Sequence, residues 1–322
     1  MIIKNNDQPS VYLRQLEALN RRLAGHHPKK EKVAQMYRNH YSGYLGERAL
    51  HYPLSFIRHK PYAILFDVRL EDFNHTYFQI DCLLLTPHFI LVLEAKNLSG
   101  SFVYNADFGF LEKVKDEKES AMNDPVHQVF TQRNKLEEWL STHKFPTLPL
   151  EARFISANPN AIFRTSNKDY ATYVIRMERL PSMINSFWDE YPSPAITTRQ
   201  FKKLYSTILQ HHVTYFPSIL AQLHIDRKDI LRRVYCNKCD AFSYRRRNSL
   251  WFCPYCNTSS NTAHQSSLTD YALLFHQHIS NAEARSFLDV ASRDVIKRLL
   301  LKENFPTTGT RKSTRYDLTS LL

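Results

Sequence analysis

Long hydrophobic segments are missing from this sequence. No run of about 20 apolar residues, the length of a membrane-spanning helix, occurs among the 322 residues. The most apolar stretch, Ile80 to Ala95, is interrupted by Asp81, by Thr86-Pro87-His88 and by Glu94. The first ten residues, MIIKNNDQPS, also lack the apolar segment of a signal peptide. These absences argue against a membrane or secreted protein, so we expect a soluble, cytoplasmic protein without a membrane partner.

Cysteine is scarce, and internal repeats are absent. The chain has five cysteines, which in a reducing compartment are not expected to form disulfides. Four of them form two Cys-x-x-Cys pairs, a spacing that favours a bound metal ion. The fifth, Cys82, has no cysteine nearby in the sequence and is expected to be a buried core residue.

The composition that remains is that of a folded, basic protein. Hydrophobic residues make up 43% and aromatic residues 13% of the chain, which is enough for a real core. The net charge is +12. From Leu231 to Leu322, 14 Lys and Arg residues stand against 7 Asp and Glu residues, a net charge of +7. Such an excess suggests a polyanionic partner, usually nucleic acid, although a basic, solvated surface explains the charge equally well.

Periodicity predicts a mixture of helices and strands. Helices are expected over residues 10–50, 125–140, 181–191 and 198–212, and strands over 62–68, 77–85, 89–96, 152–156 and 173–177. Asp124-Pro125 should open the second of these helices, with Pro125 at its first position. The order of these elements predicts an α/β domain with a mixed sheet. The composition changes near Leu231, so we divide the chain into domains at 1–230, 231–260 and 265–322.

The most informative segment is an acidic hairpin. If Pro87-His88 is a two-residue tip, paired residues have numbers that sum to 175, and Asp81 lies opposite Glu94. Alternation along the strands then puts Asp81, Glu94 and Lys96 on one face of the sheet. Two carboxylates about 5 Å apart at Cβ repel each other. A divalent cation such as Mg²⁺ or Mn²⁺ would turn this repulsion into chelation, and a neighbouring lysine can position and activate a water.

The hairpin also has a simpler interpretation. Glu94 and Lys96 would be solvated charges on a surface ladder, with Asp81 as a spare acid. The apolar residues around these charges argue against it, because charges inside a hydrophobic hairpin need partners.

An ordered set of motifs runs through this region: Gly46-Glu47, then Asp81…Glu94-Ala95-Lys96-Asn97…Gly100, then Pro125-x-x-Gln128. This set resembles the nuclease-related domain (NERD) family of the PD-(D/E)XK nuclease superfamily. The resemblance covers roughly residues 35 to 160. It implies a restriction-endonuclease-like mixed sheet flanked by helices, with Asp81 and Glu94 as metal ligands and Lys96 as the catalytic lysine. By the same resemblance, Glu47 and Gln128 support the site from neighbouring helices. Gln132 lies on the same helical face as Gln128, and solvent exposure explains its position equally well.

The paired cysteines predict a structural zinc site. Cys236 and Cys239 are separated by 13 residues from Cys253 and Cys256, and two such turns close a tetrahedral Cys₄ site for Zn²⁺. Redox chemistry is the alternative, but a doubled pair flanking a short hairpin at 242–252 argues against it. The hairpin carries three basic residues that could contact phosphates, beside two aromatic residues that could stack on bases. These residues are Arg245, Arg246, Arg247, Tyr244 and Trp251.

The last 58 residues predict a helix-turn-helix or winged-helix-like unit. Ser280 and Ser292 can each cap a helix, and residues 305–316 could form a basic β-hairpin. The helix after Ser292 would enter the major groove and the hairpin would contact phosphates. The candidate nucleic-acid contacts are Arg293, Lys297, Arg311, Lys312 and Arg315. A small helical cap packed on the core is the alternative.

Together these features predict a Mg²⁺-dependent deoxyribonuclease of the PD-(D/E)XK type, with a zinc ribbon and a winged-helix-like module that bind DNA. The alternative is a non-catalytic nucleic-acid-binding protein on a nuclease fold. Nothing in the sequence indicates an oligomeric state.

Overall fold

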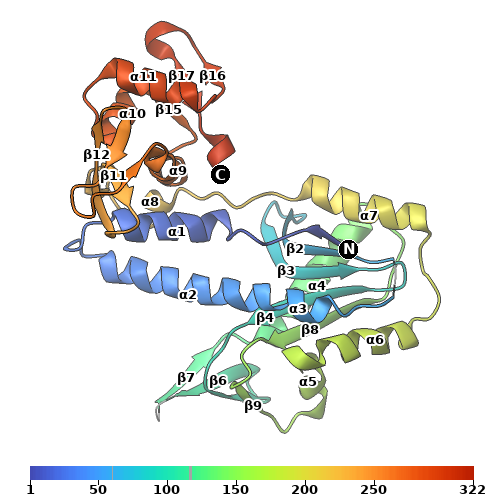
Figure 1. The fold of residues 1–322 in the computed structure, drawn as a ribbon. Helices are drawn as coiled ribbons and strands as arrows, with labels where there is room; N and C mark the ends of the chain where they lie inside the picture. Colours follow the sequence, from blue (N-terminus) through green and yellow to red (C-terminus); the bar gives the residue numbers. More distant parts are fainter. Residues whose placement is uncertain (60, 116–117) are drawn as a thin grey trace. The chain divides into compact units, whose positions relative to one another are not determined.

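The computed structural model describes residues 1–59, 61–115 and 118–322, apart from the side chains of Lys115, Lys118 and Lys312, and the chain divides into two compact units (Figure 1). The first unit consists of Met1–Ser10 and His40–Thr214, and the second of Val11–Asn39 and Tyr215–Leu322. Helix α2 (Lys30–Ala49) contributes residues to both. Among the described residues, no helix has both the length and the apolar character needed to cross a membrane.

A six-stranded mixed sheet forms the centre of the first unit, in the order β1-β2-β3-β4-β8-β10. Its strands are β1 (Ile2–Lys4), β2 (Ala63–Glu71), β3 (Tyr77–Leu85), β4 (Ile90–Lys96), β8 (Leu150–Ser156) and β10 (Val174–Arg176). Strands β2, β3 and β4 are antiparallel, whereas β4, β8 and β10 are parallel. The predicted α/β class with a mixed sheet is therefore confirmed.

Helices cover both faces of this sheet. Helices α4 (Pro125–Thr142) and α7 (Thr198–His211) pack on one face through residues such as Val129 and Leu204. Helices α3 (His51–Leu54) and α6 (Leu180–Glu190) pack on the other, where Leu54 and Ile184 are buried. Because both faces are covered, β3 and β4 are apolar on both sides. Helix α4 begins as predicted, with Pro125 in its first turn and Asp124 accepting a hydrogen bond from the amide of Val126 (2.9 Å).

A second sheet, which sequence analysis did not predict, lies in the first unit. Its order is β7-β6-β5-β9, from strands β5 (Ser101–Asn105), β6 (Phe110–Lys115), β7 (Lys118–Met122) and β9 (Ile162–Arg164). With helix α5 (Lys168–Tyr173) it encloses a small core that includes Phe102, Leu111 and Tyr170. The short 3₁₀ helix η1 (Met177–Arg179) then connects β10 to α6.

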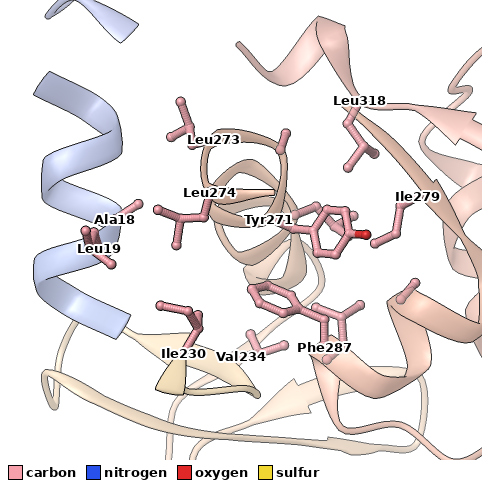
Figure 2. Close-up of a cluster of buried hydrophobic side chains, with 14 of the residues drawn as sticks. Ala18, Leu19, Ile230, Val234, Tyr271, Leu273, Leu274, Ile279, Phe287 and Leu318 are labelled. Carbon is pink, nitrogen blue, oxygen red and sulfur yellow. The ribbon is translucent and has the colours of Figure 1, made fainter. Parts of the chain in front are cut away.

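The second unit is built around one core that helices α1 (Val11–Arg22), α8 (Ile219–Gln222) and α9 (Ala263–Leu274) share. Figure 2 shows Ala18 and Leu19 of α1 beside Leu274 of α9, with Phe287 and Leu318 in the same cluster. Sequence order does not reveal this grouping, which joins residues far apart in the chain. The three-domain division of the sequence stays a prediction.

A four-stranded sheet carries the cysteines of the second unit, in the order β11-β12-β13-β14. The strands are β11 (Val234–Cys236), β12 (Ala241–Arg247), β13 (Leu250–Phe252) and β14 (Ser259–Ser260). Asn248 (φ 44°) and Ser249 (φ 66°) form the turn between β12 and β13. Two residues of positive φ are typical of the turn that best matches strand twist, and the predicted hairpin is confirmed.

Helix α9 is followed by strand β15 (His278–Ser280), helices α10 (Asn281–Leu288) and α11 (Arg293–Lys302), and strands β16 (Thr307–Thr308) and β17 (Arg315–Asp317). The strands form a sheet in the order β15-β17-β16. As predicted, Ser280 and Ser292 cap α10 and α11, and the last two strands form a hairpin. Three 3₁₀ helices complete the unit: η2 (Arg227–Asp229), η3 (Arg311–Ser313) and η4 (Thr319–Leu321).

Candidate active site and metal centre

The hairpin of β3 and β4 has the predicted register. Its pairs run from Cys82 with Leu93 to Leu85 with Ile90, so their numbers sum to 175. The backbone amide of Thr86 donates to the carbonyl of Phe89 (3.1 Å), which closes the two-residue tip. Beyond Cys82 the regular ladder stops. The amide of Ala95 donates instead to the Oδ2 atom of Asp81 (3.1 Å), which ties the Asp81 carboxylate to β4 next to Glu94.

Glu94 is the best-anchored acid of the site. Its side chain is 1% exposed. Its Oε1 atom accepts from the ammonium of Lys96 (2.5 Å) and from the Nε2 of Gln128 (2.6 Å), and its Oε2 accepts from the Nε2 of Gln132 (2.7 Å). The two glutamines lie one turn apart on α4. The structure thus brings together Glu94, Lys96 and Gln128, as the sequence predicts, and adds Gln132.

Glu47 reaches the same cluster from α2. Electrostatic coupling links its carboxyl group to Glu94 and Lys96. The preceding residue explains the close approach: a Cβ on Gly46 would lie 3.0 Å from the Cβ of Asn97, just after β4. Any other residue at position 46 would need the strand end to shift by a few tenths of an ångström.

Asp67 is a fourth acid of the cluster, and sequence analysis did not single it out. It lies within β2 between the pairs Phe66–Cys82 and Val68–Ile80, and its φ of 51° interrupts the extended backbone without a shift of register. Lys4 donates to its backbone carbonyl and Gln79 to its Oδ1 (both 2.8 Å). The sequence does contain a signal for Asp67, because it is an acid inside an apolar strand. Its position opposite Asp81, however, follows only from the pairing of β2 with β3.

The cluster carries an excess of negative charge. Burial, followed by repulsion from Glu94 and Glu47, raises the pKa of Asp81 well above its ordinary value. Burial and repulsion from Asp67 and Glu94 likewise raise the pKa of Glu47 to about 7. Burial alone would lower the pKa of Lys96, but Glu94 and the other acids outweigh it and raise the pKa. Lys96 is therefore an ammonium ion at neutral pH.

The donor types of this cluster are those that a divalent cation binds. The side chain of Glu47 makes no hydrogen bond or ion pair within the described part of the chain, and the carboxylate of Asp81 accepts a hydrogen bond only at Oδ2. Carboxylate oxygens are the ligands that Mg²⁺ and Mn²⁺ prefer, and a positive ion would offset the repulsion that raises both pKa values. The oxygens are not drawn into a tight group, however. Over the described residues, only the four cysteines bring three or more ligand atoms of His, Cys, Asp or Glu within 4.8 Å of one another.

The four cysteines form a compact cluster whose ligand atoms lie within 4.8 Å of one another, an arrangement that could hold a metal ion. Cys236 and Cys256 have their Sγ atoms 3.7 Å apart, as do Cys239 and Cys253. A tetrahedron with Zn–S bonds of about 2.3 Å has edges of about 3.8 Å. The predicted cysteine cluster is confirmed, and its spacing is compatible with a zinc ribbon.

Hydrogen bonds favour the thiolate at Cys253. Burial would raise its pKa, but donors from Ser243 and from the amides of Cys256 and Tyr255 lower it to about 6. A thiolate is the form that binds a metal, so the surroundings of Cys253 suit a ligand.

The expectation that Trp251 stacks on bases is wrong. Its side chain is 0% exposed, and its indole N–H donates to Nδ1 of His264 (3.0 Å), whose Nε2 lies 2.9 Å from Glu303. The guanidinium of Arg246 lies over the Trp251 ring, 5.2 Å from its centroid. Arg246 is thus partly used inside the fold, whereas Arg245 and Arg247 are exposed.

The remaining basic candidates lie on the surface of the second unit. Arg293, Lys297 and Arg311 are exposed. Arg315 is also exposed, and it lies 3.3 Å from the carboxylate of Glu283. The side chain of Lys312 lies outside the described residues. Because these residues are exposed, they are accessible to a phosphate backbone, and their role in nucleic-acid binding stays a prediction.

Comparison with known proteins identifies the central part of the chain. Residues 42–156 match the family model of the nuclease-related domain, as the sequence motifs predict. The matched span contains Glu47, Asp81, Glu94, Lys96 and Gln128. No curated protein and no solved structure matches the chain.

Proposed function

We propose that this protein is a metal-dependent nuclease that hydrolyses phosphodiester bonds in DNA at the cluster of Asp81, Glu94 and Lys96. The observation that carries the proposal is a set of partly buried acids around one lysine ammonium, within a nuclease-related domain. Such an arrangement costs stability in a purely structural protein, and it has the donors that phosphodiester hydrolysis needs.

In this proposal Asp81 and Glu94 hold Mg²⁺ or Mn²⁺, and Glu47 supports the ion from α2. The ion, when bound, supplies Lewis-acid stabilisation of charge on a phosphodiester oxygen. Lys96 contacts a phosphate oxygen and orients the attacking water. Gln128 and Gln132 fix the orientation of Glu94.

The second unit supports DNA as the substrate. The order helix, strand, helix, helix, strand, strand from α9 to β17 is that of a winged helix, and we propose that α11 enters the major groove. The Cys₄ cluster is proposed to hold structural Zn²⁺ in a ribbon whose Arg245 and Arg247 contact phosphates. Four reduced cysteines at a metal centre also favour a cytoplasmic location.

Cleavage assays test the catalytic part. Wild type, Asp81→Asn and Lys96→Met are incubated with plasmid and single-stranded DNA in Mg²⁺, Mn²⁺ or EDTA, with the exposed Lys202→Met as a charge-matched control. We expect both site variants to lose about 100-fold or more in rate, and Lys202→Met to keep wild-type activity. The proposal is lost if the site variants cut as fast as the wild type, or if EDTA leaves cleavage unchanged.

DNA binding tests the role of α11. Arg293→Ala/Lys297→Ala should weaken binding and reduce the salt slope by about 1.8, the loss of two phosphate contacts. Lys32→Ala/Lys228→Ala removes the same charge elsewhere in the second unit and should bind as the wild type does. Equal binding by the two double variants would rule out this role.

A second candidate function is a non-catalytic nucleic-acid-binding protein. The observation in its favour is that both oxygens of Glu94 already accept hydrogen bonds, three in all, which leaves about one of the four lone-pair sites of the carboxylate for an ion. This alternative predicts salt-dependent DNA binding by the wild type with no cleavage in either metal.

A further inference from the structure

A cavity of about 580 Å³ lies at the β10 edge of the central sheet, outside the acidic cluster. Its walls come from β10, α5, α6 and the second sheet. The volume is in the range of small-molecule and cofactor sites. All lining residues except Tyr104 and Leu111 follow residue 156, so the cavity is built mainly by elements beyond the match to the nuclease-related domain.

The cavity selects for negative charge. Of the residues that the structure describes, three arginines line it, Arg164, Arg176 and Arg179, and no carboxylate does. Arg176 is already engaged, because it donates to Glu178 (2.8 Å) and to the carbonyl of Pro159 (2.6 Å). The side chains of Arg164 and Arg179 are exposed and make no hydrogen bond or ion pair with the described residues. Two guanidinium groups are therefore available to an anionic ligand such as a phosphate.

Aromatic side chains also line the cavity, where Tyr170 is 7% exposed and has one face covered by Tyr104. Tyr104 and Tyr170 are stacked with ring centroids 3.7 Å apart, and the ring of Phe163 also lines the wall. The hydroxyl of Tyr170 donates to Asp124 (2.7 Å), which fixes this ring. Rigid aromatic walls suit a planar ligand group, and arginines beside them suit a phosphate.

The position of the cavity connects it to the acidic cluster. In the parallel strands β4, β8 and β10, Ser156 pairs with Lys96 on one side and with Arg176 on the other. Paired residues point to the same face of a sheet, and neighbouring strands are about 4.8 Å apart. The backbone at Arg176 therefore lies about 10 Å from that at Lys96, on the same level of the sheet.

We propose that this cavity binds one nucleotide unit, with its phosphate at Arg164 and Arg179 and its base against Tyr104, Phe163 and Tyr170. The inference rests on the proposed function in one respect: the nucleotide belongs to a nucleic-acid strand that also passes Lys96. A free mononucleotide has the same chemistry, and the experiment separates the two sources.

Binding is measured with the full chain in EDTA, so that it does not depend on cleavage. The probes are a short fluorescent single-stranded oligonucleotide, followed by anisotropy, and dAMP or inorganic phosphate as competitors. The test variant is Arg164→Ala/Arg179→Ala. Arg199→Ala/Lys203→Ala, on the exposed side of α7, removes the same charge from the first unit as a control. Thermal unfolding checks that both variants are folded.

We expect the pocket variant to bind the oligonucleotide about tenfold or more weakly, with a salt slope smaller by about 1.4, whereas the control stays within about twofold of the wild type. If dAMP competes better than phosphate, and if this competition is lost in Arg164→Ala/Arg179→Ala, the cavity also binds free nucleotides. The proposal is overturned if neither probe distinguishes the pocket variant from the control. The cleavage assays with the Asp81 and Lys96 variants test the proposed function separately. If the protein does not cleave DNA but still binds the oligonucleotide through the cavity, the proposed function fails and this inference holds.

Discussion

Gly46 in α2 and Asn97 after β4 touch so closely that no other residue fits at position 46 without a shift. A Cβ on Gly46 would lie 3.0 Å from the Cβ and 3.1 Å from the backbone nitrogen of Asn97. Glu47 and Lys96 are the neighbours of these two residues in the sequence. The glycine contact therefore sets the distance between the helix and the strand that carry two members of the acidic cluster.

Gly46→Ala should lower cleavage more than it lowers stability. The added methyl group has to push α2 from the strand end by a few tenths of an ångström, at a cost of about 1–3 kcal/mol, and Glu47 moves with it. Gly43→Ala is the matched control, because a Cβ there meets nothing within 4 Å. It should stabilise the helix by up to about 1 kcal/mol and leave cleavage unchanged. Urea unfolding and cleavage rates measure both, and equal effects of the two substitutions would contradict this role of Gly46.

Gln132 should behave as a positioning residue for Glu94. Gln132→Leu removes the hydrogen bond to Oε2 while keeping a buried side chain of similar size. We expect cleavage to fall about 10–100-fold and the Mn²⁺ concentration needed for half-maximal activity to rise. Thr131→Ala, exposed on the same helix, is the control. Unchanged metal dependence in Gln132→Leu would show that Glu94 does not need this donor.

Arg22 should be the most sensitive single charge in the second unit. Its Nε atom lies 2.7 Å from Oδ2 of Asp270, with the two side chains 0% and 2% exposed, and its guanidinium packs on the ring of Phe287. Arg22→Met leaves a buried carboxylate with one partner fewer and should cost about 3–5 kcal/mol. Arg22→Met/Asp270→Leu removes both charges and should cost less. Urea unfolding of the full chain measures both, and additive losses would show that the pair is not coupled.

The acidic hairpin was predictable because its evidence is local. A two-residue tip determines the register, which the pairs from Cys82–Leu93 to Leu85–Ile90 confirm, whereas the shared face of Asp81 and Glu94 stays a prediction because the regular ladder ends at Cys82. Caps such as Ser280 and Ser292 were readable for the same reason, since a cap acts within three residues. Asp67 was not predictable, because its position depends on the pairing of β2 with β3 and on a positive φ within the strand that no turn residue indicates. The packing of α1 against α9 was not predictable either, because it joins positions about 250 residues apart, such as Arg22 and Asp270.

The second sheet shows a different limit. Its strand β7 has the sequence KESAM, with little apolar alternation, and β9 has three residues. Such strands form because Phe102 and Leu111 bury a small core with Tyr170. Tertiary packing therefore overrides weak local preference, and the cavity that depends on this sheet could not be foreseen from the sequence.

Removal of the metal from the cysteine cluster should unfold part of the second unit. The purified chain should contain about one zinc ion, and the free energy of binding is free energy of folding when ligands close a site. Trp251 provides the readout, because it is fully buried in the ribbon sheet and is held by His264. A strong chelator should shift its fluorescence to longer wavelength and lower the unfolding midpoint. Trp251→Phe identifies the signal among the three tryptophans of the chain.

Cys236→Ser/Cys253→Ser should lose the zinc, whereas Cys82→Ala, which replaces a buried cysteine of the first unit, should retain it. Zinc that stays bound to the double variant would refute the Cys₄ assignment.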